Sequence, residues 1–193
     1  MKRLILICLP IVIQLSCTHN TISTSGPGET AKSQQEKNHI EQQITIGKNL
    51  KASRYAEIYF SPQPSDEDIL ELKAQGFTKI INLRRSEEGD YKESSERKAA
   101  SRAGLAYTHI PTNPKIPITD EFIDKVTSVV KKHRGSGKIL IHCSSGNRAG
   151  MWAGGHFHKD HNVSKQESLN LAKRLGLTKK PAIENVEAYL KSK

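Results

Sequence analysis

The sequence lacks an apolar run long enough to cross a membrane. Its longest run, Leu4–Leu15, contains Pro10 and Gln14, and it falls short of the about 20 apolar residues that a spanning helix needs. A basic pair of residues precedes this run and a small residue and Cys17 follow it. This arrangement is typical of a secretory signal rather than of a membrane anchor.

Cys17 indicates a bacterial lipoprotein, in which a lipid-bearing cysteine follows the cleavage site, although the residues just before it depart from the usual lipobox. We predict a signal peptide of lipoprotein type over residues 1–17. The alternatives are an ordinary cleaved signal and an uncleaved anchor. The expected location is the periplasm or cell envelope, with attachment to a membrane through the lipid on Cys17.

Cysteine is scarce, with three residues in the chain. Cys8 lies in the predicted signal and Cys17 would carry lipid, so Cys143 is the one thiol that stays free. A single thiol cannot form an intramolecular disulfide. In an oxidising compartment, Cys143 is therefore either functional or deeply buried.

Residues 18–49 contain few apolar residues and many Thr, Ser, Gln, Asn, Lys and Gly. Such a segment cannot bury enough surface to fold, and we expect a disordered tether. Residues 50–193 have the size of one domain with a single core. No internal repeat is visible in the sequence.

Within residues 50–193, short β-branched runs alternate with helical patterns. The expected strands are Ala56–Phe60, Lys79–Leu83, Leu105–Ile110 and Lys138–His142. The expected helices are Asp66–Gly76, Tyr91–Ala103, Asp120–His133, Arg148–Asp160, Ser164–Leu175 and Ala182–Lys191. This alternation predicts an α/β fold, a three-layer sandwich in which helices flank a central, mostly parallel sheet of about four to five strands.

The stretch Lys138–Gly150 holds the candidate site. A strand ends at Cys143, Arg148 opens a helix, and the loop between them is Ser144, Ser145, Gly146 and Asn147. Such a loop forms a cradle for an anion, because free backbone N–H groups and the positive helix end point into it. The same field favours the thiolate form of Cys143, and Arg148 adds a donor fork for two oxygens of a tetrahedral anion.

The ordinary alternative is a buried core cysteine followed by a glycine turn, since free cysteine is among the most buried residue types. The combination with an arginine and a following helix favours the anion site. Three further residues have both a functional and an ordinary interpretation, and a fourth has only the ordinary one. His142 supports the thiolate or is a plain strand residue, Arg84 and Arg85 hold an anionic substrate or are solvated, and Trp152 is expected to pack in the core.

The positions of His142, Cys143 and Gly146 resemble the HCxxGxxR loop of cysteine-dependent phosphatases of the dual-specificity and tyrosine class. The arginine comes one residue early, so the loop is C-x4-R rather than C-x5-R. Ala149 stands where those enzymes usually carry Ser or Thr. The missing residue removes roughly 3.5 Å of contour, which leaves fewer N–H groups for a phosphate. The C-x4-R length also resembles many rhodanese-type sulfurtransferases, which use a cysteine persulfide.

A longer resemblance covers most of the folded part of the chain. The run YFSPQPSDEDILELKAQGFTKIINLRRSEEGD, then YTHIPT and the cysteine loop, resembles the phosphatase-like domain called beta-lactamase-hydrolase-like. That family carries the QP element, the INLR strand, the HIP strand end and a short C-x-S-G-x-R loop in the same order. The resemblance implies a cysteine-phosphatase fold.

It also implies a hydrolase of phosphate monoesters, similar to protein tyrosine and dual-specificity phosphatases. Cys143 would attack phosphorus to give a phosphocysteine, and water would then release phosphate. The phosphate oxygens would be held by Arg148 and by the loop residues Ser144, Ser145, Gly146 and Asn147. No metal or organic cofactor is expected. The alternatives are a sulfurtransferase that uses a persulfide on Cys143 and a non-catalytic anion-binding module.

A general acid for the leaving group is missing from its usual place. The loop Thr112–Ile118, which follows the HIP strand end, contains no carboxylate. The remaining candidates are Asp120 at a helix start and Glu87, Glu88 and Asp90 in the loop after the INLR strand. Each is also explained as a first-turn helix residue or as part of a solvated loop. The missing acid favours the sulfurtransferase alternative, because sulfur transfer needs none.

The string from His156 to His161 spells HxHxDH, the zinc motif of metallo-β-lactamases. It stands at a helix end, and no His or Asp follows it to complete such a site. We therefore predict a polar helix end and no physiological metal site.

The formal net charge is +10, which becomes +8 when Lys2 and Arg3 are removed. This excess favours anionic partners such as phosphate esters, lipid headgroups or acidic polymers. Because the basic residues are scattered and no nucleic-acid motif is present, we expect an anionic phosphorylated substrate and no nucleic acid.

Overall fold

We describe residues 40–86, 88–89 and 91–193 of a computed structural model. The predicted signal peptide and residues 18–39 of the predicted tether lie outside this range. None of the helices in it is long and apolar enough to span a membrane.

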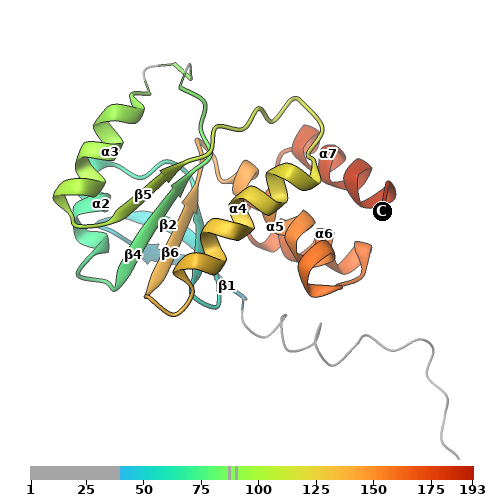
Figure 1. Ribbon diagram of the computed structural model, residues 1–193, viewed down its shortest axis with the longest axis horizontal. Helices are drawn as coiled ribbons and strands as arrows, with labels where there is room; N and C mark the ends of the chain where they lie inside the picture. The colour runs from blue at the N-terminus through green and yellow to red at the C-terminus, as the bar shows by residue number, and fades with distance from the viewer. Residues whose placement is uncertain (1–39, 87, 90) are drawn as a thin grey trace, which may run out of the picture.

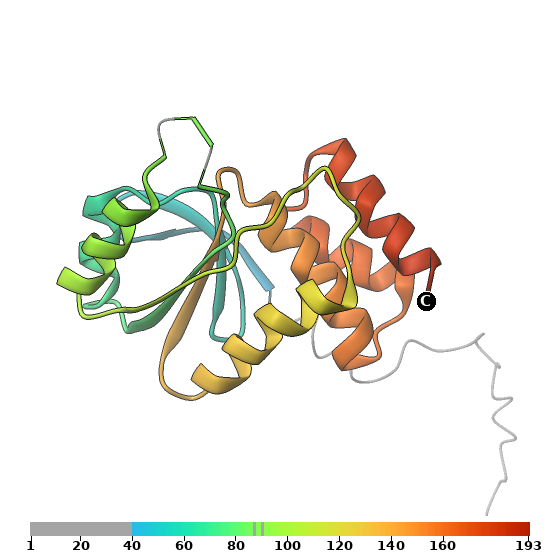
Figure 2. The same cartoon turned by 45° about the horizontal axis from the view of Figure 1, so that its top comes forward.

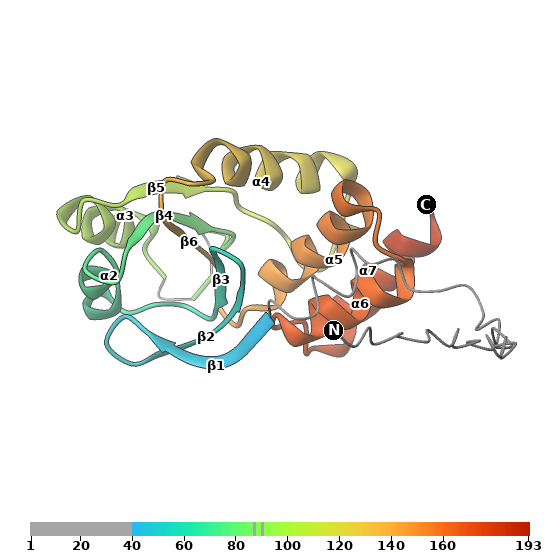
Figure 3. The ribbon, with the colours of Figure 1, turned by 90° about the horizontal axis from the view of Figure 1, so that it is seen from below.

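One sheet of six strands lies between two helical layers (Figures 1 and 3). The strands are β1 Ile40–Ile46, β2 Leu50–Tyr55, β3 Ile58–Ser61, β4 Phe77–Asn82, β5 Ala106–His109 and β6 Lys138–His142. The helices are α2 Asp66–Leu72, α3 Glu93–Arg102, α4 Asp120–His133, α5 Asn147–His161, α6 Lys165–Arg174 and α7 Lys180–Lys191. The predicted α/β three-layer sandwich is confirmed.

Strand β6 occupies the middle of the sheet, whose order is β1-β2-β3-β6-β4-β5. The four strands from β3 to β5 are parallel. Side chains of β6 alternate between the two faces: Ile139 and Ile141 pack with α4 to α7, and Leu140 packs with α2 and α3. Figure 2 shows these two groups of helices on opposite sides of the sheet. The residues after His142 therefore emerge at the carboxyl end of a central parallel strand, where α/β folds bind ligands.

The start of the domain and the number of strands differ from the sequence prediction. Strands β1 and β2 form an antiparallel hairpin that extends the sheet from β3. Strand β1 lies within residues 18–49, which we predict as tether, so that boundary is wrong. Ile40 and Ile46 are 8% and 4% exposed. A few apolar side chains thus hold a mostly polar strand at the sheet edge, and average composition does not reveal them.

The helix starts follow the capping signals of the sequence. The Oγ of Ser65 accepts a hydrogen bond from the backbone N–H of Asp68 at 3.1 Å. Thr119 caps α4 in the same way, accepting from the N–H of Phe122 at 3.2 Å. These caps start α2 and α4 at the predicted residues, and the two helices pack on opposite faces of the sheet.

Candidate active site

Cys143 follows β6 directly and lies at the base of the loop that leads into α5. It is 1% exposed, whereas the next residue, Ser144, is exposed. Gly146 precedes α5 with a φ of +82°, a conformation that glycine adopts without the strain a Cβ would bring. The chain thus has the strand, tight loop and helix start that an anion cradle requires.

The guanidinium of Arg148 is buried and held by several acceptors. Its Nη1 donates to two main-chain carbonyls, of Leu83 at 3.0 Å and of Thr112 at 3.2 Å. Its Nη2 donates to the Oγ of Ser144 at 3.1 Å. These contacts join the ends of three chain segments around the loop and fix the plane of the guanidinium.

Glu88 completes the surroundings of Arg148. Nη1 and Nη2 of Arg148 both donate to the carboxylate of Glu88, and Nη2 lies 2.8 Å from Oε2. The Nε of Arg84 donates to the same Oε2 at 3.2 Å. Burial alone would raise the pKa of Glu88, but the hydrogen bonds from Arg148, from the backbone of Arg85 and from Arg84 lower it to about 2. Glu88 is therefore ionised at neutral pH and has no proton for a leaving group.

Arg148 is also tied electrostatically to Cys143. Burial lowers the pKa of this arginine, but its hydrogen bond to Glu88 and the charges of Cys143 and Glu88 outweigh burial and raise it. Arg148 thus remains a cation next to the sulfur.

Asp120 has partners of its own away from the loop. It accepts hydrogen bonds from the hydroxyl of Tyr189 and from the Nζ of Lys193, both at 2.6 Å. The bonds from Lys193 and Tyr189 lower its pKa. Glu87 and Asp90 lie outside the described residues. Neither Glu88 nor Asp120 is therefore suited to protonate a leaving group.

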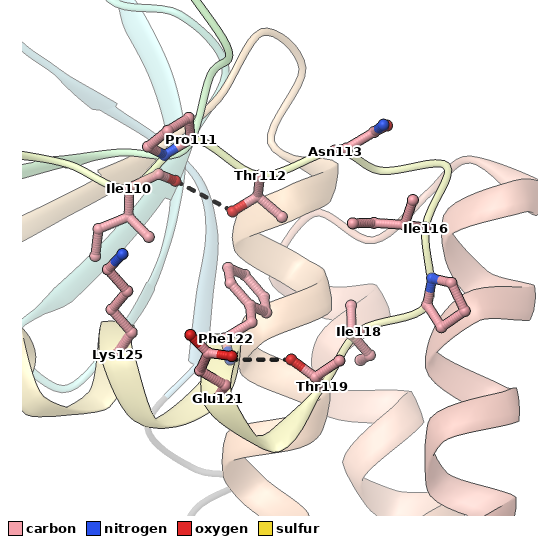
Figure 4. Close-up of a pocket in the computed structure, with 11 residues that line it drawn as sticks. Ile110, Pro111, Thr112, Asn113, Ile116, Ile118, Thr119, Glu121, Phe122 and Lys125 are labelled. Atoms are coloured by element: carbon pink, nitrogen blue, oxygen red, sulfur yellow. Dashed lines mark hydrogen bonds between the residues drawn. The ribbon is translucent and has the colours of Figure 1, made fainter.

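An apolar pocket lies under the loop between β5 and α4 (Figure 4). Ile116, Ile118 and Phe122 point into it, and Asn113 points away. Its lining is Ile110, Pro111, Thr112, Asn113, Ile116, Pro117, Ile118, Thr119, Glu121, Phe122 and Lys125. Because the carbonyl of Thr112 accepts from Arg148, the loop that closes this pocket also contacts the arginine.

The predicted phosphate-binding residues do not all direct their side chains toward the cradle. Ser144 contacts Arg148, as described. Asn147 uses its Oδ1 to accept from the backbone N–H groups of Thr178 at 2.9 Å and Lys179 at 2.8 Å. Its Nδ2 donates to Ser145. The side chain of Asn147 therefore links the loop to the start of α7. Only the backbone N–H of Asn147 remains for the predicted role as a phosphate ligand.

His142 is paired with a residue that sequence reasoning missed. Its Nε2 lies 2.6 Å from the Oε1 of Glu96, and the two side chains are 0% and 3% exposed. Nδ1 of His142 is buried and has no hydrogen-bond partner within the described part of the chain. Glu96 occurs in a polar helix, but it shares a face with the buried Ala99 and Ala100. That spacing is the signal that marks it as buried.

The histidine string forms a packed cluster at the end of α5. Nδ1 of His156 lies 2.9 Å from the Oδ2 of Asp160, and Nε2 of His156 lies 3.2 Å from the Nε2 of His161. Burial first, and then the charge of His161, lowers the pKa of His156 to about 4. Trp152 stacks on His156 and is buried, as predicted. Among the described residues, no group of three or more His, Cys, Asp or Glu could hold a metal ion.

Comparison with known proteins agrees with this geometry. The family model described as "Beta-lactamase hydrolase-like protein, phosphatase-like domain" matches residues 54–156. A beta-lactamase hydrolase-like protein of Xylella fastidiosa is 36% identical over 93 residues, which are 47% of this chain and 21% of that protein. The chain thus matches about a fifth of the length of this curated relative.

Two solved structures have a similar fold. One is TpbA of P. aeruginosa in complex with phosphotyrosine, with a TM-score of 0.59, 18% identity and coverage of 72% of this chain and 82% of that chain. The other is kinase associated phosphatase, with a TM-score of 0.60, 14% identity and coverage of 78% and 97%. At these identities the likeness shows a shared cysteine-phosphatase fold.

Proposed function

Because the chain belongs to the family of phosphatase-like domains of beta-lactamase hydrolase-like proteins, we propose that it is a cysteine-dependent phosphatase that acts on phosphate monoesters. The observation that carries this proposal is the pairing of Cys143, at the base of the loop, with Arg148, a buried cation whose orientation Glu88 fixes. A nucleophile and a fixed cation on one anion cradle are the parts that phosphoryl transfer to sulfur requires.

In the proposed reaction, the thiolate of Cys143 attacks phosphorus, the S–P bond forms and the bond from phosphorus to the ester oxygen breaks. Arg148 and the loop N–H groups stabilise the charge on the equatorial oxygens. Water then attacks the phosphocysteine, which releases inorganic phosphate and restores the thiolate. Nothing in these two displacements requires a metal.

The partners of Glu88 and Asp120 also favour a class of substrate. Since both carboxylates are ionised and engaged, neither of these two described residues can supply a proton to the leaving group. A phenolate leaves more readily than an alkoxide because its conjugate acid has a pKa of about 10. We therefore favour aryl phosphates such as phosphotyrosine, the ligand seen with TpbA. The signal-like residues 1–17 support placing this activity in the cell envelope.

The test is an assay of the purified, reduced chain beside Cys143→Ser and Arg148→Lys, without added metal. We expect hydrolysis of p-nitrophenyl phosphate, its loss in Cys143→Ser, and a decrease of about 100-fold in Arg148→Lys, because an ammonium cannot replace the planar donor fork. Transfer of sulfur from thiosulfate to cyanide is measured in parallel. Sulfur transfer without phosphate release would identify a sulfurtransferase. The absence of both activities would contradict hydrolysis of simple aryl phosphates and leave an anion-binding module or an unusually selective enzyme.

A further inference from the structure

A chain of polar side chains leads from Arg148 to the QP element of the sequence. Glu88, which holds Arg148, also accepts from the Nε of Arg84 at 3.2 Å. The Nη1 of Arg84 in turn donates to the Oε1 of Gln63 at 2.9 Å. The buried cation Arg148 is thus connected, through Glu88 and Arg84, to the side-chain amide of Gln63, which follows β3.

From Gln63 the hydrogen bonds continue to the residue that precedes the nucleophile. Its Nε2 donates to the Oε2 of Glu96 at 2.9 Å, and the other oxygen of Glu96 meets His142 at 2.6 Å. His142 directly precedes Cys143. These side chains form an unbroken series of hydrogen bonds from Arg148 to His142, which the main chain between His142 and Arg148 closes into a ring. We call it the hydrogen-bond ring, and its members are Arg148, Glu88, Arg84, Gln63, Glu96 and His142.

The charges of the ring explain why an amide stands at position 63. On one side Gln63 faces a guanidinium, which needs an acceptor, and on the other side it faces a carboxylate, which needs a donor. An amide supplies one of each, whereas a carboxylate would repel Glu96 and an ammonium would repel Arg84. Gln63 is thus the member of the ring that can bond to a cation, Arg84, and to an anion, Glu96, at the same time.

The backbone around Gln63 runs along the cysteine loop. Ser61 is the register partner of His142 in the parallel pair of β3 and β6. Pro62 forms an isolated bridge with Ser145, inside the loop. Gln63 is therefore one residue away from a main-chain contact with the cradle, and its side-chain bonds fix the same segment from the other side.

We propose that Gln63 is a positioning residue of this site, which couples the pair of Glu88 and Arg148 to the pair of Glu96 and His142. This inference rests on the proposed function, because it assigns a role in the same reaction. Gln63 acts through its partners on both sides of Cys143, without touching the sulfur. Its substitution changes the environment of the thiol even where the fold is intact.

The electrostatic part of this role depends on what surrounds Glu96. It faces His142 from β6, Tyr107 from β5 and Tyr91 from the segment before α3, besides Gln63. Burial raises the pKa of Glu96, but the charge and hydrogen bond of His142 and the bonds from Gln63 and Tyr91 outweigh burial and lower it. Gln63 thus helps to keep a negative charge stable beside His142.

The experiment compares Gln63→Glu with Gln75→Glu in the full-length, reduced chain. Gln75 is a matched control, because its amide is also partly buried and makes two hydrogen bonds, with the N–H and the carbonyl of Gly47 at 2.9 and 2.8 Å. The rate of alkylation of Cys143 by iodoacetamide is followed against pH by mass spectrometry of its peptide. Gln63→Glu should raise the midpoint of that profile by about half a pH unit or more, since added negative charge disfavours the thiolate. Gln75→Glu should leave the midpoint unchanged.

Kinetics on p-nitrophenyl phosphate separate a positioning role from a structural one. We expect Gln63→Glu to lower kcat about tenfold with a smaller change in KM, and Gln75→Glu to change neither. Equal alkylation profiles for folded Gln63→Glu and Gln75→Glu would overturn the proposal. If wild type shows no hydrolysis, the proposed function fails, while the alkylation profiles still report whether Gln63 acts on Cys143.

A double-mutant cycle tests the polarity argument directly. Adding Glu96→Gln to Gln63→Glu puts the carboxylate next to Arg84 and an amide next to His142, so every bond of the ring again has a donor and an acceptor. We expect the double variant to lose less activity than the two single losses multiplied, by about fivefold or more. Independent effects would contradict coupling through Gln63. If Gln63→Glu does not fold, Gln63→Met removes the same bonds without adding charge and is expected to lower kcat.

Discussion

At the scale of single residues, the structure separates two kinds of carboxylate around the cysteine loop. Glu88 is ionised and held by arginines, and Glu96 is buried against His142. A general acid needs a proton at working pH, and the arginines around Glu88 exclude that state. The charge of Glu88 serves instead to orient Arg148. The contribution of this ion pair can therefore be measured as a change in the free energy of unfolding.

We predict that Glu88→Gln lowers the free energy of unfolding at pH 7 by about 2 kcal/mol, because Arg148 loses its buried partner. The pKa of Glu88 is about 2 in the native chain, against an ordinary value of 4.5 for a glutamate. Its contribution is therefore full above about pH 4.5 and is lost as the pH falls toward 2. Urea unfolding at pH 7 and pH 3 measures the difference between the two chains.

The difference should be smaller at pH 3 than at pH 7. Glu93→Gln is the matched control, since Glu93 pairs with Arg97, which is exposed on the surface of α3. It should change stability by less than about 0.5 kcal/mol at either pH. A constant difference between wild type and Glu88→Gln across this range would contradict the assignment of Glu88 as a buried ion-pair partner.

At the scale of elements, the cradle depends on how closely α5 packs on the segment before α7. A Cβ at Gly150 would lie 2.7 Å from the backbone nitrogen of Leu177 and 3.0 Å from its Cα. The side chain of Asn147 binds the same segment one and two residues further on, at Thr178 and Lys179. The start of α5 is therefore placed by backbone contact as well as by hydrogen bonds.

We predict that Gly150→Ala destabilises the protein by about 1–3 kcal/mol, although alanine is the better helix former by about 1 kcal/mol. The obstacle is backbone, which cannot rotate away. Gly155→Ala in the same helix is the control, because there a Cβ meets the end of the Ile123 side chain, which can move. Thermal unfolding of both variants checks the order, and an equal or lower melting temperature for Gly155→Ala would refute it.

A related prediction concerns Asn147. Replacing it by alanine leaves the backbone N–H groups of Thr178 and Lys179 without their acceptor, and we expect a loss of about 1–2 kcal/mol. Asn147→Asp retains an acceptor oxygen and should recover most of that stability. Urea unfolding of the two variants tests this, and equal losses would show that the acceptor is not what matters.

At the scale of the whole molecule, the β1 and β2 hairpin belongs to the folded domain. Beyond the apolar contacts of β1, the turn between the strands is tied to α2, since Asp68 accepts from the N–H groups of Lys48 at 3.0 Å and Asn49 at 2.9 Å. Removing β1 together with this turn would expose β2 as a sheet edge, which invites pairing with other chains.

We therefore predict that residues 50–193 melt at least about 10 °C below residues 40–193. We also expect the shorter chain to form a larger amount of soluble aggregate. Circular dichroism and size-exclusion chromatography measure the two effects. Equal melting temperatures would mean that the hairpin contributes nothing to the stability of the sheet.

Local sequence determined much of this protein. The β-branched runs and the helical patterns predicted four of the strands and the six helices, because both signals act within a few residues. The loop from Cys143 to Arg148 was visible for the same reason. A polar strand such as β1 escaped this reasoning, since its three isoleucines barely change the composition of the segment.

Tertiary structure decided which charges meet. Arg148 and Glu88 are 60 residues apart in the chain, and His142 and Glu96 are 46 apart. In the sequence, Glu88 belongs to a charged loop and Glu96 to a polar helix. Only the packing of α3 and of the segment after β4 against the end of β6 brings them beside Cys143, because contact between distant residues depends on which faces of the sheet and helices pack together, and no local pattern encodes that choice.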